Sequence, residues 1–222
     1  MRFTSHRDFA RAFERALRRA HVPIAFSSGF TPHPKISYAS AAPTTVASEA
    51  EYLEIAVIER VDPATLARDL DAVLSPGLDV LEAVEAHGGS LAERIEVSRW
   101  RVELPGVDAS AAAHAVEAFL AATEVPVERL TKQGKRTIDA RGPVVLLSPS
   151  GGPAEPCAIL DLVVRHVTPS VRPDDVLAGL RTVADLAPPV PPRATRLAQG
   201  TLGAAGDIVD PLAADRDQAV SG

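Results

Sequence analysis

The sequence of 222 residues has one cysteine, few aromatic residues and no long apolar run. The single thiol of Cys157 can neither form an intramolecular disulfide nor supply the several thiolates of an iron–sulfur cluster. No stretch approaches the roughly 18 apolar residues that a membrane-spanning helix needs. Motifs for nucleotide binding, zinc proteases and serine hydrolases are missing as well, and nothing points to DNA. We therefore expect a cytoplasmic protein with no membrane segment and no metal or cofactor of its own.

Lysine is also scarce, with three residues in the chain, and the formal net charge is −6. Cationic groups nevertheless gather near the start, because the first 40 residues hold seven lysines and arginines against two acids. The remainder of the chain is correspondingly acidic. An uneven charge distribution of this kind predicts an anionic partner that binds in one orientation.

The pattern of residues 5–20 predicts an amphipathic helix. Phe9 and Phe13 recur at helical spacing and mark its apolar face. Because the N-terminus of a helix attracts anions, Ser5 and His6 are candidate anion-binding residues. Four arginines fall on the side of the helix opposite the apolar face, and they are Arg7, Arg11, Arg15 and Arg18.

A turn-rich stretch, SSGFTPHPK, occupies residues 27–35. Its prolines fix their own φ and bias the preceding residues to extended geometry, so the stretch predicts a stiff loop that loses little entropy on binding. Its cationic groups suit a phosphate, and its phenylalanine suits a base. The candidate anion-binding residues here are Ser28, Gly29, Phe30, His33 and Lys35. We expect this loop and the arginines to converge on one phosphate-sized cradle. The alternative is a stiff connection in which His33 caps a backbone carbonyl.

The order of predicted elements repeats along the chain. Residues 1–90 indicate helix, strand, strand, helix and a last strand within 76–86, and residues 96–199 indicate strand, helix, two strands, helix and strand. This order predicts an α+β protein of two tandem ferredoxin-like (βαββαβ) units with antiparallel sheets, the first lacking its opening strand. A start codon downstream of the true one would explain the missing strand. Residues 200–222, rich in Gly, Ala and Asp without a period, predict a disordered tail.

Four short motifs run through the first 55 residues. They are Phe-x-Ser-His-x-Asp at 3–8, an arginine-rich helix at 11–19, Ser-Gly-Phe-x-Pro-His-Pro-Lys at 28–35 and Ser-x-x-Glu-Tyr at 48–52. In these motifs the chain resembles an uncharacterised bacterial family, the radical-SAM-linked proteins of unknown function. The resemblance implies a radical SAM enzyme as partner, because members are encoded beside such enzymes or fused to them. It also implies RNA or ribosome biology, because the genes lie near those for an RNase E/G-type ribonuclease and for ribosomal proteins.

The basic pole and the resemblance together predict an RNA-binding accessory protein. It would act with a radical SAM enzyme in the modification or maturation of RNA or ribosomes, without catalytic activity of its own. Two alternatives stay open. One is a protein-interaction module that docks on the radical SAM partner through its arginine face, without RNA. The other is a metal-independent RNA endonuclease in which His6 and His33 act as general acid and base on a 2′-hydroxyl.

Overall fold

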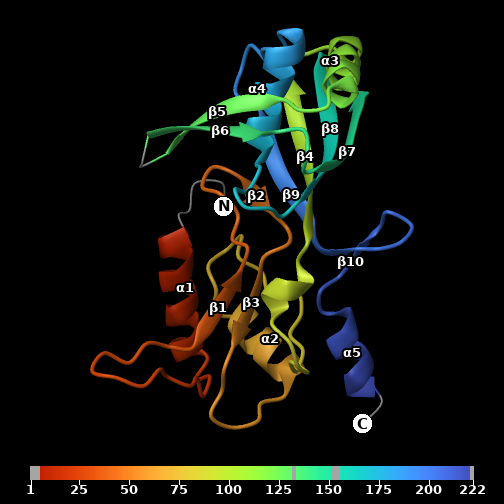
Figure 1. Cartoon of the computed structure of the whole chain (residues 1–222). Helices are drawn as coiled ribbons and strands as arrows, with labels where there is room; N and C mark the ends of the chain where they lie inside the picture. The colour runs from red at the N-terminus through yellow and green to blue at the C-terminus, as the bar shows by residue number, and fades with distance from the viewer. Residues whose placement is uncertain (1–5, 132–133, 152–155, 221–222) are drawn as a thin grey trace. The chain divides into compact units, whose positions relative to one another are not determined.

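The structure, a computed structural model, describes residues 6–131, 134–151 and 156–220 (Figure 1). Its helices and antiparallel strands confirm the predicted α+β class. In this part of the chain, no helix is both long and apolar enough to cross a membrane. The chain divides into two compact units, a first unit of residues 1–47, 51–95 and 209–222 and a second unit of residues 48–50 and 96–208.

The first unit is built around a two-stranded antiparallel sheet. Its elements are α1 (His6–Arg19), β1 (Ile36–Ala39), β3 (Tyr52–Ile55), α2 (Pro63–Asp71), the 3-10 helix η1 (Leu91–Arg94) and α5 (Ala213–Val220). In the sheet, Ile36 lies opposite Ile55 and Ser37 lies opposite Glu54. Because side chains alternate along a strand, Ile36 and Ile55 share one face, and Ser37 and Glu54 share the other.

Helix α1 confirms the helix predicted from the spacing of apolar residues. Phe13 and Leu17 are buried, at 5% and 1% exposure, against Leu70 of α2. Ile36 and Ile55 pack against the same cluster, so α1 covers their face of the sheet. Burial of this apolar stripe, rather than helix propensity alone, holds α1 in place.

The second unit contains a larger antiparallel sheet and two helices. Its elements are β4 (Val97–Pro105), α3 (Ala109–Ala121), β5 (Pro126–Thr131), β6 (Gly134–Asp139), β7 (Val144–Gly151), β8 (Cys157–Arg165), α4 (Pro173–Ala184) and β9 (Arg193–Leu202). The strands run in the order β10-β9-β4-β8-β7, with β10 at Ile208–Val209, and β2 (Ala47–Ser48) also pairs with β9. Strands β5 and β6 form a separate hairpin. Figure 1 shows α3 and α4 side by side, and their tight contact requires Gly179, whose added Cβ would lie 2.7 Å from the ring of Phe119.

The last strand expected in the first unit does not form. Residues 76–86 carry no strand. Side-chain contacts of this stretch run to other elements instead. The N–H of Val80 donates to Asp71 Oδ1 at 2.8 Å, and the Glu82 carboxylate binds Arg216. The tandem ferredoxin-like arrangement therefore stays a prediction.

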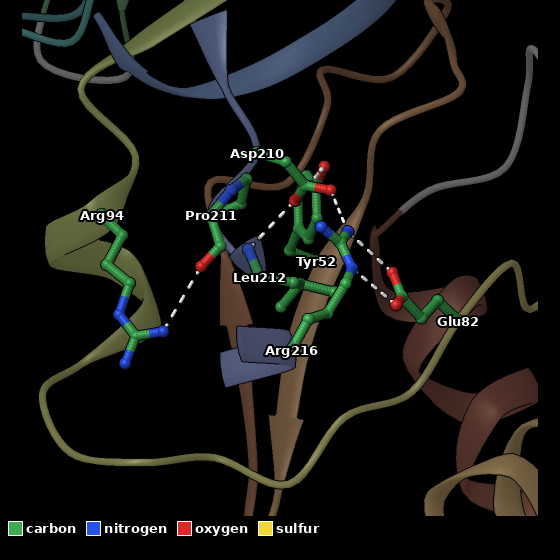
Figure 2. A network of polar contacts seen from close by, with 7 residues as sticks. All are labelled: Tyr52, Glu82, Arg94, Asp210, Pro211, Leu212 and Arg216. Carbon is green, nitrogen blue, oxygen red and sulfur yellow. Dashed lines mark hydrogen bonds and ion pairs between the residues drawn. The ribbon is translucent and has the colours of Figure 1, made fainter. Parts of the chain in front are cut away.

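The prediction of a disordered tail from residue 200 is also wrong for residues 200–220, and residues 221–222 lie outside the described part of the structure. Residues 200–202 complete β9, and the chain continues through β10 into α5. Figure 2 shows the contacts responsible, in which Arg216 binds both Glu82 and Asp210. Beside them, Arg94 Nη1 lies 2.6 Å from Oδ2 of Asp215, whose side chain is 4% exposed. The Ala- and Asp-rich composition gave no sign of the ion pairs with Glu82 and Arg94, because these partners lie more than 100 residues away in the sequence.

Candidate functional site

The PHP hairpin, which we define as residues 25–35, is closed by its own backbone. The N–H of Ser27 donates to the carbonyl of His33 at 2.8 Å, and the N–H of His33 donates back to Ser27 Oγ at 3.0 Å. The N–H of Lys35 donates to the carbonyl of Ala25, also at 2.8 Å. The N–H of Ala25 donates to the carbonyl of Ala56, which joins the hairpin to the end of β3. These bonds and the two prolines make a stiff projection from the sheet.

The tip of the hairpin presents its side chains to solvent. Phe30 is fully exposed, and Ser28 and His33 are exposed as well. Gly29 adopts a φ of +133°, a backbone conformation that side-chain-bearing residues rarely reach, so the tight turn depends on glycine. An exposed aromatic ring at a stiff tip has no role in a core and is available for a ligand.

The arginines of α1 form the second surface, which we call the arginine row: Arg7, Arg11 and Arg15. All three are exposed, and none has a hydrogen-bond or ion-pair partner among the described residues. Successive members lie about 6 Å apart along the helix axis. Arg18, the fourth predicted member, differs because its Nη2 lies 3.9 Å from the carboxylate of Glu14.

The single cradle that we expected from the sequence is wrong. Tyr38 of β1 meets Phe9 of α1 edge-on, with 5.9 Å between ring centroids, so the face of β1 that holds Ile36 and Tyr38 lies under α1. Lys35 and Ser37 alternate with these residues and point to the opposite face. Lys35 is therefore separated from the arginine row by the sheet. The hairpin and the arginine row are two surfaces rather than one.

Lys35 instead lines an open groove that the sequence reasoning missed. The groove has a volume of about 330 Å³, and its polar side chains are Lys35, Ser37 and Glu54. Ala56 and Ala86 line it too. Polar and apolar residues alternate in KIS at 35–37 and in LEI at 53–55, and this alternation could have predicted that Lys35, Ser37 and Glu54 share a face. It could not have predicted that Ala86 lies over the strands.

The two tyrosines of the first unit lie against charged neighbours. Burial, together with the nearby carboxylate of Glu14, raises the pKa of Tyr38 to about 12. Burial and the carboxylate of Asp210 raise the pKa of Tyr52 to about 12 as well. The hydroxyl of Tyr52 donates to Asp210 Oδ1 at 3.5 Å. Tyr52, the last residue of the Ser-x-x-Glu-Tyr motif, therefore links β3 to the segment that leads into α5.

The structure does not test the predicted catalytic pair of His6 and His33, because only the His33 side chain is described. Ser5 and the side chain of His6 lie outside the described part of the structure. No contact of the His33 ring supports RNA cleavage among the described residues, so catalysis by His6 and His33 stays a prediction. In the same part of the chain, no group of three His, Cys, Asp or Glu residues is arranged to hold a metal ion.

These features define an α+β protein with a stiff aromatic hairpin, a row of unpaired arginines and a polar groove in its first unit. The model of a bacterial family, described as uncharacterized protein conserved in bacteria (DUF2344), matches residues 1–173, so the chain belongs to this family. The match includes the hairpin, the arginine row and the groove. No curated protein matches the chain. Membership of an uncharacterised bacterial family, inferred from the motifs, is confirmed, whereas the link to radical SAM enzymes stays a prediction.

Proposed function

We propose that this chain is an RNA-binding accessory protein whose arginine row contacts phosphates. The observation that carries the proposal is the state of Arg7, Arg11 and Arg15, which are exposed and unpaired among the described residues. Other arginines of the same unit, such as Arg60 and Arg68, have carboxylate partners at 2.8 and 3.0 Å. Guanidinium groups without such partners suit phosphate oxygens, which accept two hydrogen bonds from one fork.

The PHP hairpin favours single-stranded RNA, rather than an RNA duplex, as the ligand. An RNA duplex keeps its bases stacked inside, whereas unpaired bases can stack on an aromatic side chain. Phe30 offers its ring on a projection that hydrogen bonds already hold. A pre-ordered element of this kind loses little conformational entropy when it binds.

The partner in this proposal is a radical SAM enzyme, and the complex acts in the modification or maturation of RNA or ribosomes in the cytoplasm. The family resemblance in the first 55 residues supports this step. Any iron–sulfur cluster would belong to the partner, since this chain has one cysteine.

We further infer that the second unit is ferredoxin-like. The chain order β4, α3, β7, β8, α4, β9 and the sheet order β9-β4-β8-β7 support this inference. In this interpretation the β5–β6 hairpin is an insertion between the first helix and the second strand.

The RNA proposal is tested by the double substitution Arg11→Gln and Arg15→Gln. We expect affinity for a single-stranded RNA to fall at least tenfold in fluorescence polarisation. We also expect the slope of log K against log salt concentration to become shallower by about 1.4, because two fewer phosphates are neutralised.

The matched control is the double variant Arg60→Gln and Arg68→Gln, which removes two arginines of the same unit that carboxylates already neutralise. It should bind RNA as the unchanged protein does. Equal losses in both variants would show a nonspecific effect of net charge and would contradict a role for the arginine row.

A protein-docking module is the second candidate, and one observation favours it. Phe26, at 50% exposure, joins Phe30 as an exposed aromatic residue of the same hairpin. Exposed aromatic residues are typical of protein interfaces. A partner that co-purifies after nuclease treatment, and is lost with Phe26→Ala but kept in the arginine double variant, would favour this candidate over RNA.

A further inference from the structure

The groove on the face of β1 and β3 opposite α1 brings together three polar side chains of different character. Ser37 lies directly opposite Glu54 in the sheet, and Lys35 lies two residues before Ser37, so all three share one face. Their side chains have no hydrogen-bond or ion-pair partner among the described residues. The groove therefore offers a cation, a hydroxyl and a carboxylate side by side, each available to a ligand.

We propose that this groove recognises the ribose hydroxyls of one RNA nucleotide, so that Glu54 distinguishes RNA from DNA. The inference rests on the RNA-binding function proposed above. Lys35 would hold the phosphate, while the Glu54 carboxylate and Ser37 hydroxyl accept hydrogen bonds from the sugar. A carboxylate that accepts from a ribose 2′-hydroxyl is a known mode of sugar recognition, and the 2′-hydroxyl is the group that separates RNA from DNA.

The charge of the groove argues for a nucleotide sugar rather than a bare polyanion. A site for phosphate groups alone would gain nothing from Glu54, which repels them. A ligand that carries one phosphate beside hydroxyl donors matches both Lys35 and Glu54.

The size and position of the groove fit the same ligand. About 330 Å³ is near the lower end of the range for small-ligand clefts, which suits one nucleotide and is too small for a duplex. Lys35 also ends the PHP hairpin, whose backbone is bonded to Ala56 through Ala25. An RNA chain that stacks a base on Phe30 would therefore reach Lys35 along the same PHP hairpin.

The test compares three labelled single strands of one sequence, as RNA, as DNA and as 2′-O-methyl RNA, by fluorescence polarisation. We expect the unchanged protein to bind RNA about tenfold more tightly than either of the others, which is the effect of one hydrogen bond to a charged group. Glu54→Ala should bring the RNA-to-DNA ratio close to one.

Two further variants make the result specific. Glu59→Ala removes the same charge outside the groove and should leave the ratio unchanged, although both affinities rise slightly. Ala86→Leu fills the groove without a change in charge and should lower the ratio as Glu54→Ala does. It also serves if Glu54→Ala does not fold.

The outcomes separate this inference from the function on which it rests. Equal binding of RNA and DNA, or a ratio that neither Glu54→Ala nor Ala86→Leu changes, overturns the groove as a sugar site and leaves RNA binding by the arginine row intact. Absence of binding to all three strands in the unchanged protein overturns both.

Discussion

Phe30 is the residue whose surroundings differ most from the usual place of its type. A phenylalanine side chain gains most by burial, yet Phe30 is fully exposed at the tip of a hairpin. The hydrogen bonds between Ser27 and His33 hold that tip without any contribution from the ring. The ring therefore gains no stabilisation from burial on folding, which is expected of a residue kept for binding.

We predict that Phe30→Ala leaves stability unchanged and weakens RNA binding. Removal of an exposed ring should change the free energy of unfolding by no more than about 0.5 kcal/mol. Loss of one stacked base should lower affinity for single-stranded RNA about tenfold. Urea unfolding and fluorescence polarisation measure the two quantities. Leu81→Ala, which removes another exposed apolar side chain at 83% exposure, is the control and should affect neither. Unchanged RNA affinity in Phe30→Ala would rule out stacking at the tip.

The local chemistry of the site could be predicted from the sequence, but its assembly could not. Helical spacing placed Arg11 and Arg15 on the solvent side of α1, and the prolines around His33 indicated a stiff loop, because both effects act within a few residues. The place of Lys35 depends on which face of β1 the helix covers. That choice is made by packing between distant segments, so the expected cradle was wrong and Glu54 was missed.

At the scale of elements, α5 shows how the chain end is fastened to the first unit. Asp215 accepts hydrogen bonds from Arg94 Nη1 at 2.6 Å and from the N–H of His87 at 3.0 Å. Burial alone would raise the pKa of Asp215, but these bonds outweigh it and lower the pKa below its ordinary value of 3.8. The carboxylate therefore stabilises the folded state where it is ionised. Sequence composition around residue 213 carried no sign of this contact, because Arg94 and His87 lie more than 100 residues away.

We predict that Asp215→Asn lowers the free energy of unfolding of the first unit by about 3 kcal/mol at neutral pH, since it leaves Arg94 without its buried partner. The folded-state pKa of Asp215 is depressed, so its contribution is present above the unfolded-state pKa and is lost as pH falls through the folded-state value. The difference between the two proteins should thus be full at pH 7, begin to narrow near pH 3.8 and continue to narrow as pH falls towards the lower folded-state pKa. Urea unfolding at several pH values, followed by tyrosine near-UV circular dichroism, measures it.

The control for this experiment is Asp79→Asn, which neutralises an exposed carboxylate of the same unit. It should leave stability unchanged at every pH. A gap between Asp215→Asn and the unchanged protein that persists at pH 2 would mean that packing, and not the charge of Asp215, fastens α5.

For the whole molecule, the distribution of its chromophores allows the two units to be observed separately. The chain has one tryptophan and two tyrosines. Trp100 belongs to the second unit, where it is 6% exposed and Arg196 lies 5.4 Å from its ring centroid. Tyr38 and Tyr52 both belong to the first unit. Tryptophan fluorescence therefore reports unfolding of the second unit, and tyrosine signals report the first.

The same distribution predicts that alkali destabilises the first unit and not the second. Burial, with nearby carboxylates, raises the pKa of both Tyr38 and Tyr52 from 10.0 to about 12. A raised folded-state pKa means that the stabilising effect is fully present below pH 10 and is lost as pH rises to about 12, because the unfolded chain releases its protons first. Thermal unfolding between pH 9 and pH 12 should show the tyrosine-reported Tm fall while the Trp100-reported Tm holds. Tyr38→Phe, which leaves Tyr52 as the reporter, should make that fall smaller. If tyrosinate absorbance appears near pH 10 in the folded protein, or if both Tm values fall together, the tyrosines of the first unit are not the groups that respond to alkali.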